Sequence, residues 1–176
     1  MTYKGLQKRM CMFLVNHVYS GTKHFEKKRR LLQKAGFTIG EGSKIVGPIF
    51  CTGQLIIGKN CWIGKNLTVN GNGTVTIGDC CDIAPDVTFQ TGTHRIGTHG
   101  RRAGEGSNRD IFVGNGCWLC VRSTVLGGVR IGDGSVVAAC GCVNKDVAQD
   151  TLVGGVPADT IRKLTDDQTI VTQCSR

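Results

Sequence analysis

Two histidines near the middle of the chain are the residues best suited to acid–base chemistry. His94 ends the segment Thr91–His94, and His99 follows five positions later. A neutral imidazole can accept a proton from a hydroxyl group near neutral pH, which makes His94 a candidate general base. A single loop histidine is more often an ordinary surface residue, so the surrounding elements must decide. We interpret His17 and His24 as surface or packing residues.

The ten cysteines offer a second kind of chemistry. Cys117 and Cys120 have the Cys-x-x-Cys spacing of redox pairs and zinc ligands. No secretory signal is visible, and the apolar run Met10–Val15 is too short to span a bilayer. We therefore expect a cytoplasmic protein whose thiols stay reduced.

A six-residue repeat predicts the elements that must position these residues. Counted in sixes from Ile39, with two extra residues after Val69 and a long interruption after Phe89, fourteen of fifteen positions are Ile, Val, Leu or Phe. A period of six fits neither an α-helix nor an alternating strand. It fits a short strand and a corner, three of which make one turn of a triangular prism of stacked parallel strands. The fifteen positions are Ile39, Ile45, Cys51, Ile57, Ile63, Val69, Ile77, Ile83, Phe89, Val113, Leu119, Val125, Ile131, Val137 and Val143.

The same repeat favours a structural role for the cysteines. Cys61, Cys81 and Cys117 occupy the fifth slot, where other units have serine, and Cys51 occupies an inward slot. Small buried thiols behave as hydrophobic residues. Cys117 and Cys120 fall in different slots and should diverge, so we expect no metal site.

Basic charge is concentrated at the N-terminus. The chain has a net charge of +9, and residues 1–38 contain nine Lys or Arg and one acidic residue. The nearly neutral body argues against a nucleic-acid partner. A 40% hydrophobic and 20% charged composition also excludes a disordered chain and a membrane bundle. The run Lys27–Arg30 is a solvated face, a patch for an acidic ligand, or a weak contact with an anionic membrane surface.

Three regions are predicted along the chain. Residues 1–38 form a basic helical segment, with a second helix from an N-cap at Thr22 to Ala35. Residues 39–164 form an all-β domain. Residues 165–176 form a polar tail.

The long interruption of the repeat should leave the prism. Phe89 and Val113 are 24 residues apart, which is one unit plus 18 residues, so residues 95–110 are expected to protrude as a loop. After the repeat resumes, a strand and a short C-terminal helix should close the domain within residues 149–164.

Four stretches resemble the hexapeptide-repeat acyltransferases, above all the sugar and polysaccharide O-acetyltransferases of the galactoside and maltose type. They are Thr74–His94, Gly114–Trp118, Gly127–Asp146 and Gly154–Leu164. The resemblance implies a left-handed parallel β-helix, acetyl-CoA as acetyl donor, and a homotrimer with active sites between prisms. It also implies acetyl transfer to a hydroxyl of a sugar or polysaccharide precursor, with His94 at the position of the catalytic histidine.

The resemblance also indicates which residues bind acetyl-CoA. Val121 and Ala139 match positions that line the pantetheine arm through backbone groups. Lys145 and Arg162 are basic residues that suit phosphate. Two positions depart from the family pattern: Asn144 stands where threonine is common, and Asp159 where arginine often stands. The candidate binding residues are Val121, Ala139, Asn144, Lys145 and Arg162.

Asn72 and Arg101 are candidates on the acceptor side, and Glu105 is a candidate catalytic residue beside His94. Asn72 replaces an acidic residue that is frequent in the family, and either binds a sugar hydroxyl or only shapes its turn. Arg101 suits an anionic acceptor or the neighbouring subunit. Glu105 is a candidate to orient His94, although a backbone carbonyl would serve equally well.

Other functions of this fold stay open. A zinc enzyme of the γ-carbonic-anhydrase type needs three histidines; His94 and His99 fit in part, but residues 39–93 contain no histidine. A non-catalytic β-helix is a second alternative. Among enzymes, the acceptor could be the hydroxyl of serine or of an antibiotic, or the amine of a nucleotide sugar.

Overall fold

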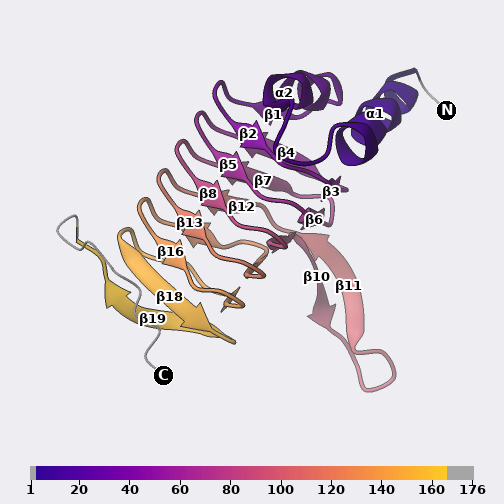
Figure 1. Cartoon of the computed structure of the whole chain (residues 1–176). Helices are drawn as coiled ribbons and strands as arrows, with labels where there is room; N and C mark the ends of the chain where they lie inside the picture. Colours follow the sequence, from indigo (N-terminus) through magenta and orange to yellow (C-terminus); the bar gives the residue numbers. More distant parts are fainter. Residues whose placement is uncertain (1–2, 166–176) are drawn as a thin grey trace.

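The chain forms a three-sided prism of parallel strands with two helices at its N-terminal end (Figure 1). The structure is a computed structural model that describes residues 3–165. Sheet A contains β1 (Thr38–Ile39), β4 (Gln54–Ile57), β7 (Thr74–Ile77), β12 (Ile111–Val113) and β15 (Arg130–Ile131). Sheet B contains β2 (Lys44–Ile45), β5 (Trp62–Ile63), β8 (Asp82–Ile83), β13 (Trp118–Leu119), β16 (Val136–Val137), β18 (Thr151–Gly155) and β19 (Ala158–Lys163). Sheet C contains β3 (Ile49–Cys51), β6 (Leu67–Asn70), β9 (Thr88–Gln90), β14 (Thr124–Leu126) and β17 (Cys142–Val143), and β10 (Gly92–Ile96) and β11 (Ala103–Asn108) form a separate hairpin.

The repeat positions build the core. All fourteen Ile, Val, Leu and Phe residues of the repeat are buried, and Cys51 is half-buried. Each coil stacks on the next in register, as in the pair Phe112↔Arg130. The predicted all-β, left-handed parallel β-helix is confirmed.

The fifth-slot cysteines bond to the neighbouring coil. The thiols of Cys61 and Cys81 donate to the carbonyls of Gly78 and Gly114, each at 3.0 Å. Ser43 and Ser135 use their hydroxyls in the same way. Small side chains with a donor are thus selected here because they fit the corner and pair a buried carbonyl.

The glycine after each inward residue makes room for a polar ladder along the A–B edge. The Asn115 side-chain oxygen accepts a hydrogen bond from the backbone N–H of Asp79 at 2.9 Å. A Cβ on Gly78 would lie 2.6 Å from that oxygen. Asp79 and Asp133 make equivalent bonds in adjacent coils.

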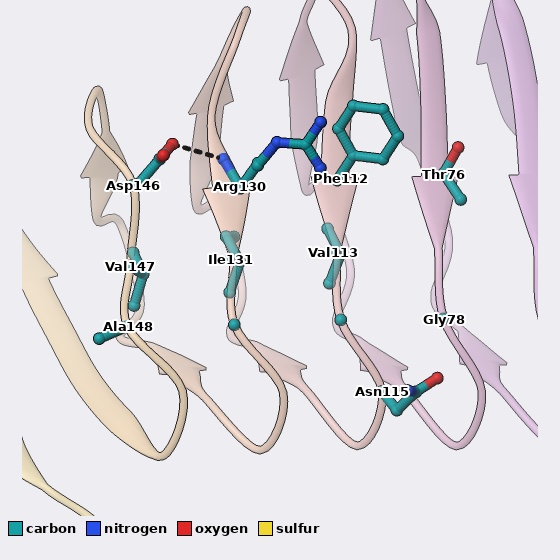
Figure 2. A pocket seen from close by; sticks show the side chains of 12 residues that line it. Thr76, Gly78, Phe112, Val113, Asn115, Arg130, Ile131, Asp146, Val147 and Ala148 are labelled. Atoms are coloured by element: carbon teal, nitrogen blue, oxygen red, sulfur yellow. Dashed lines mark hydrogen bonds between the residues drawn. The ribbon is translucent and has the colours of Figure 1, made fainter.

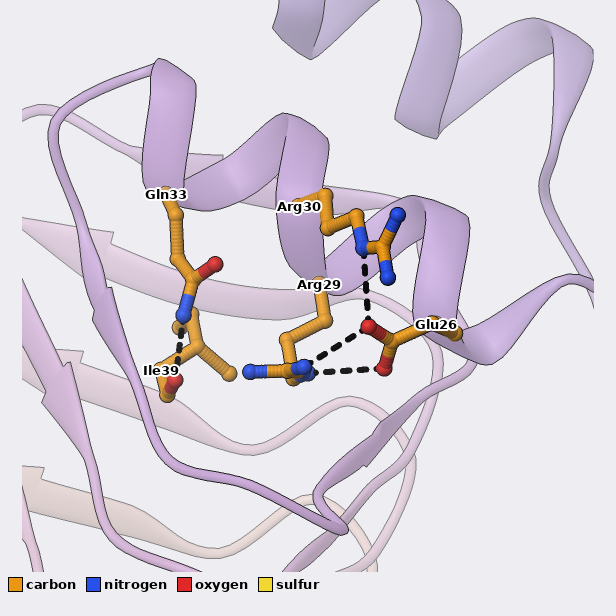
Figure 3. Close-up of polar contacts among 5 residues, drawn as sticks. All are labelled: Glu26, Arg29, Arg30, Gln33 and Ile39. Carbon is orange, nitrogen blue, oxygen red and sulfur yellow. Dashed lines mark hydrogen bonds and ion pairs between the residues drawn. The ribbon is translucent and has the colours of Figure 1, made fainter.

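Two helical segments cover the first coil. They comprise α1 (Tyr3–Phe13), which continues into the π-helical η1 (Leu14–Val18), and α2 (Phe25–Lys34). The Gln33 side chain donates to the carbonyl of Ile39 at 2.8 Å and ties α2 to β1 (Figure 3). The predicted start of the second helix at Thr22 is wrong: the preceding residue of α2 is His24, in a left-handed conformation with φ 56°.

Lys28 is a buried structural residue rather than a surface charge. Its side chain is fully buried, and its Nζ donates to the carbonyls of Gly21 at 2.6 Å and Val46 at 3.0 Å. Burial lowers the pKa of Lys28 to about 8.

The rest of the basic run does not form one patch either. Arg29 and Arg30 both pair with Glu26, at 2.7 and 2.9 Å (Figure 3). Lys27 places its Nζ 4.2 Å from the centre of the Tyr19 ring. Of the residues expected to contact a membrane surface, Lys28 is thus buried, whereas Lys27 and Arg30 are exposed. In residues 3–165 no helix could cross a membrane.

The C-terminal end differs from the prediction. Residues 158–163 form β19, which pairs antiparallel with β18 from Thr151↔Lys163 to Gly155↔Ala158, so the expected short helix is absent from the described residues. The open edge of sheet B offers backbone hydrogen bonds that outweigh the helical propensity of this segment. The predicted tail falls outside the described residues after Thr165.

Candidate functional site

The expected loop is an ordered hairpin that leaves the prism at the C–A edge. β10 and β11 pair antiparallel between β9 and β12 and project away from the prism (Figure 1). At its root the buried Thr91 hydroxyl donates to the carbonyl of Asn70 at 2.8 Å, and Arg109 donates its N–H to the carbonyl of Thr91 at 2.9 Å. The root is therefore fixed to the prism on both strands.

His94 is held in one ring orientation by the hairpin itself. Its Nδ1 lies 2.9 Å from the carbonyl oxygen of Gly104. Since a carbonyl only accepts, Nδ1 carries the proton and Nε2 is left free to accept one. The cross-strand partner is Gly106, whose missing side chain leaves space for the ring: a Cβ there would lie 3.4 Å from Cε1.

Glu105 does not orient His94 in this chain. Adjacent strand residues point to opposite faces, and Gly106 shares the face of His94, so the Glu105 carboxylate lies on the other face. The Gly104 carbonyl takes the orienting role. A register shift between His94 and Ile96 marks a bulge at this point of the hairpin, a feature common beside functional sites.

Asn72 lies at the root of the same hairpin. Its backbone N–H donates to the Asn108 side chain at 2.7 Å, while its own side chain is exposed. Gly71, with φ 90°, approaches so closely that a Cβ would lie 2.4 Å from the backbone nitrogen of Gly92. The structure thus brings Asn72 to the edge that carries His94, whereas Arg101 lies in the turn at the far tip.

Asn144 and Lys145 follow on the same C–A edge, in a later coil. Lys145 Nζ lies 3.1 Å from Asp159 Oδ1, and both side chains are exposed. The Thr160 backbone N–H and then Lys145 lower the pKa of Asp159. Arg162 lies half-buried on β19, opposite Leu152.

Val121 and Ala139 lie together on another edge, between sheets B and C. They occupy the same corner of successive coils, joined by the bond from the Cys140 N–H to the Val121 carbonyl at 3.0 Å. Within the described part of the chain, the backbone N–H groups of Val121 and Ala139 have no hydrogen-bond partner. Sheet C separates this edge from His94, so one chain alone does not bring the two groups together.

A shallow groove on the outer face of sheet A was not predicted (Figure 2). The Arg130 guanidinium lies 4.0 Å from the centre of the Phe112 ring, and the Asp146 carboxylate accepts the Arg130 backbone N–H at 2.8 Å. Outward positions carry no repeat signal, which is why the sequence did not reveal it. Across residues 3–165 no three potential metal ligands cluster.

Comparisons with known proteins agree with this fold. No protein-family model matches the chain. The galactoside O-acetyltransferase of Escherichia coli K12 is 33% identical over 165 residues, which cover 93% of this chain and 80% of that protein. A galactoside acetyltransferase solved with coenzyme A superposes with a TM-score of 0.81 at 34% identity, covering 93% of this chain and 82% of that one. A hexapeptide-repeat acetyltransferase from Vibrio cholerae O1 biovar eltor, solved with acetyl coenzyme A, superposes with a TM-score of 0.80 at 31% identity. The match covers 93% of this chain and 88% of that one.

Proposed function

Because the chain belongs to the hexapeptide-repeat acetyltransferases of the galactoside O-acetyltransferase type, we propose that it transfers an acetyl group from acetyl-CoA to a hydroxyl of a sugar or polysaccharide precursor. The observation that carries the proposal is the single orientation of the exposed His94, whose Nδ1 faces the Gly104 carbonyl and whose Nε2 is the nitrogen left to accept a proton. Membership of this family gives the general activity, which is acetyl-CoA-dependent acyl transfer.

His94 acts as the general base. Its Nε2 accepts the proton of the acceptor hydroxyl as the oxygen becomes nucleophilic, and the Gly104 carbonyl holds the imidazolium that forms. As the bond between the acetyl carbon and sulfur breaks, His94 passes the proton to the departing coenzyme A thiolate. No covalent enzyme intermediate is needed for such a direct transfer.

The residues predicted to bind acetyl-CoA suit the groups that this donor presents. Acetyl-CoA itself supplies an activated thioester. The N–H groups of Val121 and Ala139, which have no partner within residues 3–165, can donate to amide carbonyls of the pantetheine arm. Lys145 and Arg162 suit the phosphates, and Asn144 adds a polar side chain beside Lys145. Asp159 opposes this charge and must release Lys145 on binding.

The site is completed between copies of the chain. His94 and the Val121 corner lie on different edges of one prism, so we infer a homotrimer in which one subunit supplies the base and its neighbour the pantetheine-binding corner. Asn72 faces the acceptor beside His94, and Arg101 at the hairpin tip reaches the neighbouring subunit or an anionic acceptor. Light scattering tests this arrangement, and an active monomer would contradict it.

The decisive experiment compares two histidines of one hairpin. His94→Ala should lower kcat by about 10²–10⁴-fold, the usual contribution of a general base. His99→Ala is the matched control, because His99 is exposed near the tip of the hairpin, and it should leave kcat unchanged. Equal activity of both variants would remove His94 from the mechanism.

The acceptor is found with a panel assayed for release of the CoA thiol. The panel contains galactosides, maltose, a polysaccharide precursor, serine and an amino nucleotide sugar, so that O- and N-acetylation are distinguished. Cys80 and Cys140 are exposed and react with thiol reagents themselves, so each assay needs a blank without acceptor. Acetylation of the nucleotide sugar alone would replace the hydroxyl acceptor by an amine.

A further inference from the structure

Helix α1 carries apolar side chains on two opposite faces. One face holds Cys11 and Met12, continues to Val15 in η1, and packs on the core. The opposite face carries a row of residues three and four positions apart, which therefore share one side of the helix. This row, here called the outer stripe, has side chains that are 55–82% exposed and consists of Tyr3, Leu6, Met10 and Phe13. A helix that is apolar all round is normally buried, so we expect the outer stripe to be covered by a partner.

The outer stripe is a continuous surface at the N-terminal end of the molecule. Two shallow hollows run along it: Leu6 and Met10 line both, Tyr3 extends the first and Phe13 extends the second. Of the thirteen large apolar side chains that are exposed in the described residues, five lie within Tyr3–Val18. Figure 1 shows α1 beside the first coil, at the end of the prism opposite β18 and β19. Single exposed apolar residues are normal, whereas a contiguous patch of this kind marks an interaction surface.

The segment that carries the outer stripe is basic. No acidic residue precedes Glu26 in the sequence, whereas four basic residues do: Lys4, Lys8, Arg9 and Lys23. Arg9 lines one of the two hollows together with the outer stripe. Two copies of this surface facing each other would bring like charges together, which disfavours self-association through it. The complementary partner is an apolar surface with negative charge.

We propose that the outer stripe lies on an anionic membrane surface, with α1 parallel to the lipid–water interface. In this binding mode the apolar side chains enter the boundary between headgroups and acyl chains, and basic residues contact anionic headgroups. Tyr3 and Phe13 stand at the two ends of α1 and supply aromatic rings, which are common in interfacial helices. A helix of 11 residues suffices, because it lies on the bilayer and does not cross it.

Co-sedimentation of the full chain with vesicles tests this proposal without acetyl-CoA, so its failure would leave the proposed acetyl transfer untouched. Vesicles of equal parts phosphatidylcholine and phosphatidylglycerol should bind the protein at least about tenfold more tightly than vesicles of phosphatidylcholine alone, since about two basic residues near the surface account for this factor. Salt at molar concentration should remove most of the difference, because it screens the attraction.

A matched pair of double variants assigns the binding to the outer stripe. Met10→Ser with Phe13→Ser removes two of its four apolar side chains and should weaken binding to the anionic vesicles at least about tenfold. Ile96→Ser with Val156→Ser is the control, because it removes two exposed apolar side chains that lie on other elements. The control variant should bind as the unmodified protein does.

Three results would overturn the proposal. They are equal or no binding to the two kinds of vesicle, equal binding by the two double variants, and a smaller oligomer for Met10→Ser with Phe13→Ser in light scattering. The last result would make the outer stripe a contact between copies of the chain. The comparison of the two vesicle compositions uses the unmodified protein, so it stands even if a variant folds poorly.

Discussion

Gly78→Ala tests the ladder that joins successive coils. The added Cβ would lie 2.6 Å from the Asn115 side-chain oxygen and 2.8 Å from the carbonyl carbon and oxygen of Gly114. These separations are shorter than any normal contact, and the Gly114 atoms belong to the backbone, which cannot rotate away. The coil must therefore shift, and Asn115 must release the Asp79 N–H.

The expected loss of stability combines two effects. Overpacking of a tight interior typically costs about 1–3 kcal/mol, and the lost hydrogen bond adds about 0.5–1.5 kcal/mol. We expect a total of about 2–4 kcal/mol, which for a chain of this size lowers Tm by roughly 5–15 °C.

Urea unfolding of Gly78→Ala measures this loss directly. Gly100→Ala is the matched control, since a Cβ on Gly100 meets nothing within 4 Å. The double variant Gly78→Ala/Asn115→Ala removes one of the clashing atoms and should be less destabilised than the sum of the single variants. Equal stability of the Gly78 and Gly100 variants, or strict additivity with Asn115→Ala, would refute this account of the repeat glycine.

Three further outcomes are expected from the ion pair, the buried lysine and the buried serine. Asp159→Asn should lower the KM for acetyl-CoA about two- to fivefold, because Lys145 is freed for phosphate although the exposed pair is weak; an unchanged KM would separate Lys145 from the cofactor. Unfolded Lys28 keeps its proton up to pH about 10.5, whereas the folded residue loses it near pH 8. The free energy of unfolding, measured in urea, should therefore rise from pH 8 to 10.5 relative to that of Lys28→Met. The same pH dependence in both proteins would contradict the burial of Lys28. The Ser123 hydroxyl is buried without a partner among the described residues. Ser123→Ala should therefore raise the free energy of unfolding by about 0.5–1.5 kcal/mol. A loss of stability in the same urea titration would show that the hydroxyl does make a stabilising hydrogen bond.

The prism was predictable because its signal is repeated many times. Each coil contributes an inward aliphatic residue and a small corner residue, so an exception such as Cys51 does not hide the period. The hairpin was foreseen only as a protruding loop. Its second strand, Ala103–Asn108, is rich in glycine and polar residues, and becomes a strand only because Gly92–Ile96 pairs with it. The same kind of tertiary pairing makes Ala158–Lys163 a strand.

Candidate residues could be named from the sequence where their chemistry is local and not where it depends on register. His94 marks itself by its type and by its place at the break in the repeat. Its orienting group is a backbone carbonyl, which has no sequence signature. Phe112 and Arg130 belong to different coils, and only the pairing of β12 with β15 brings them into one groove.

The root of the hairpin has a consequence for how such a protein can change. β9 and β12 keep their partners in the adjacent coils although the excursion between them is long, as Phe89↔Val125 and Val75↔Ile111 show. A change in the length or sequence of the hairpin beyond its root therefore leaves the strand pairing of the prism unaltered. The hairpin that carries His94 can thus change in length or sequence while the stacked coils stay as they are.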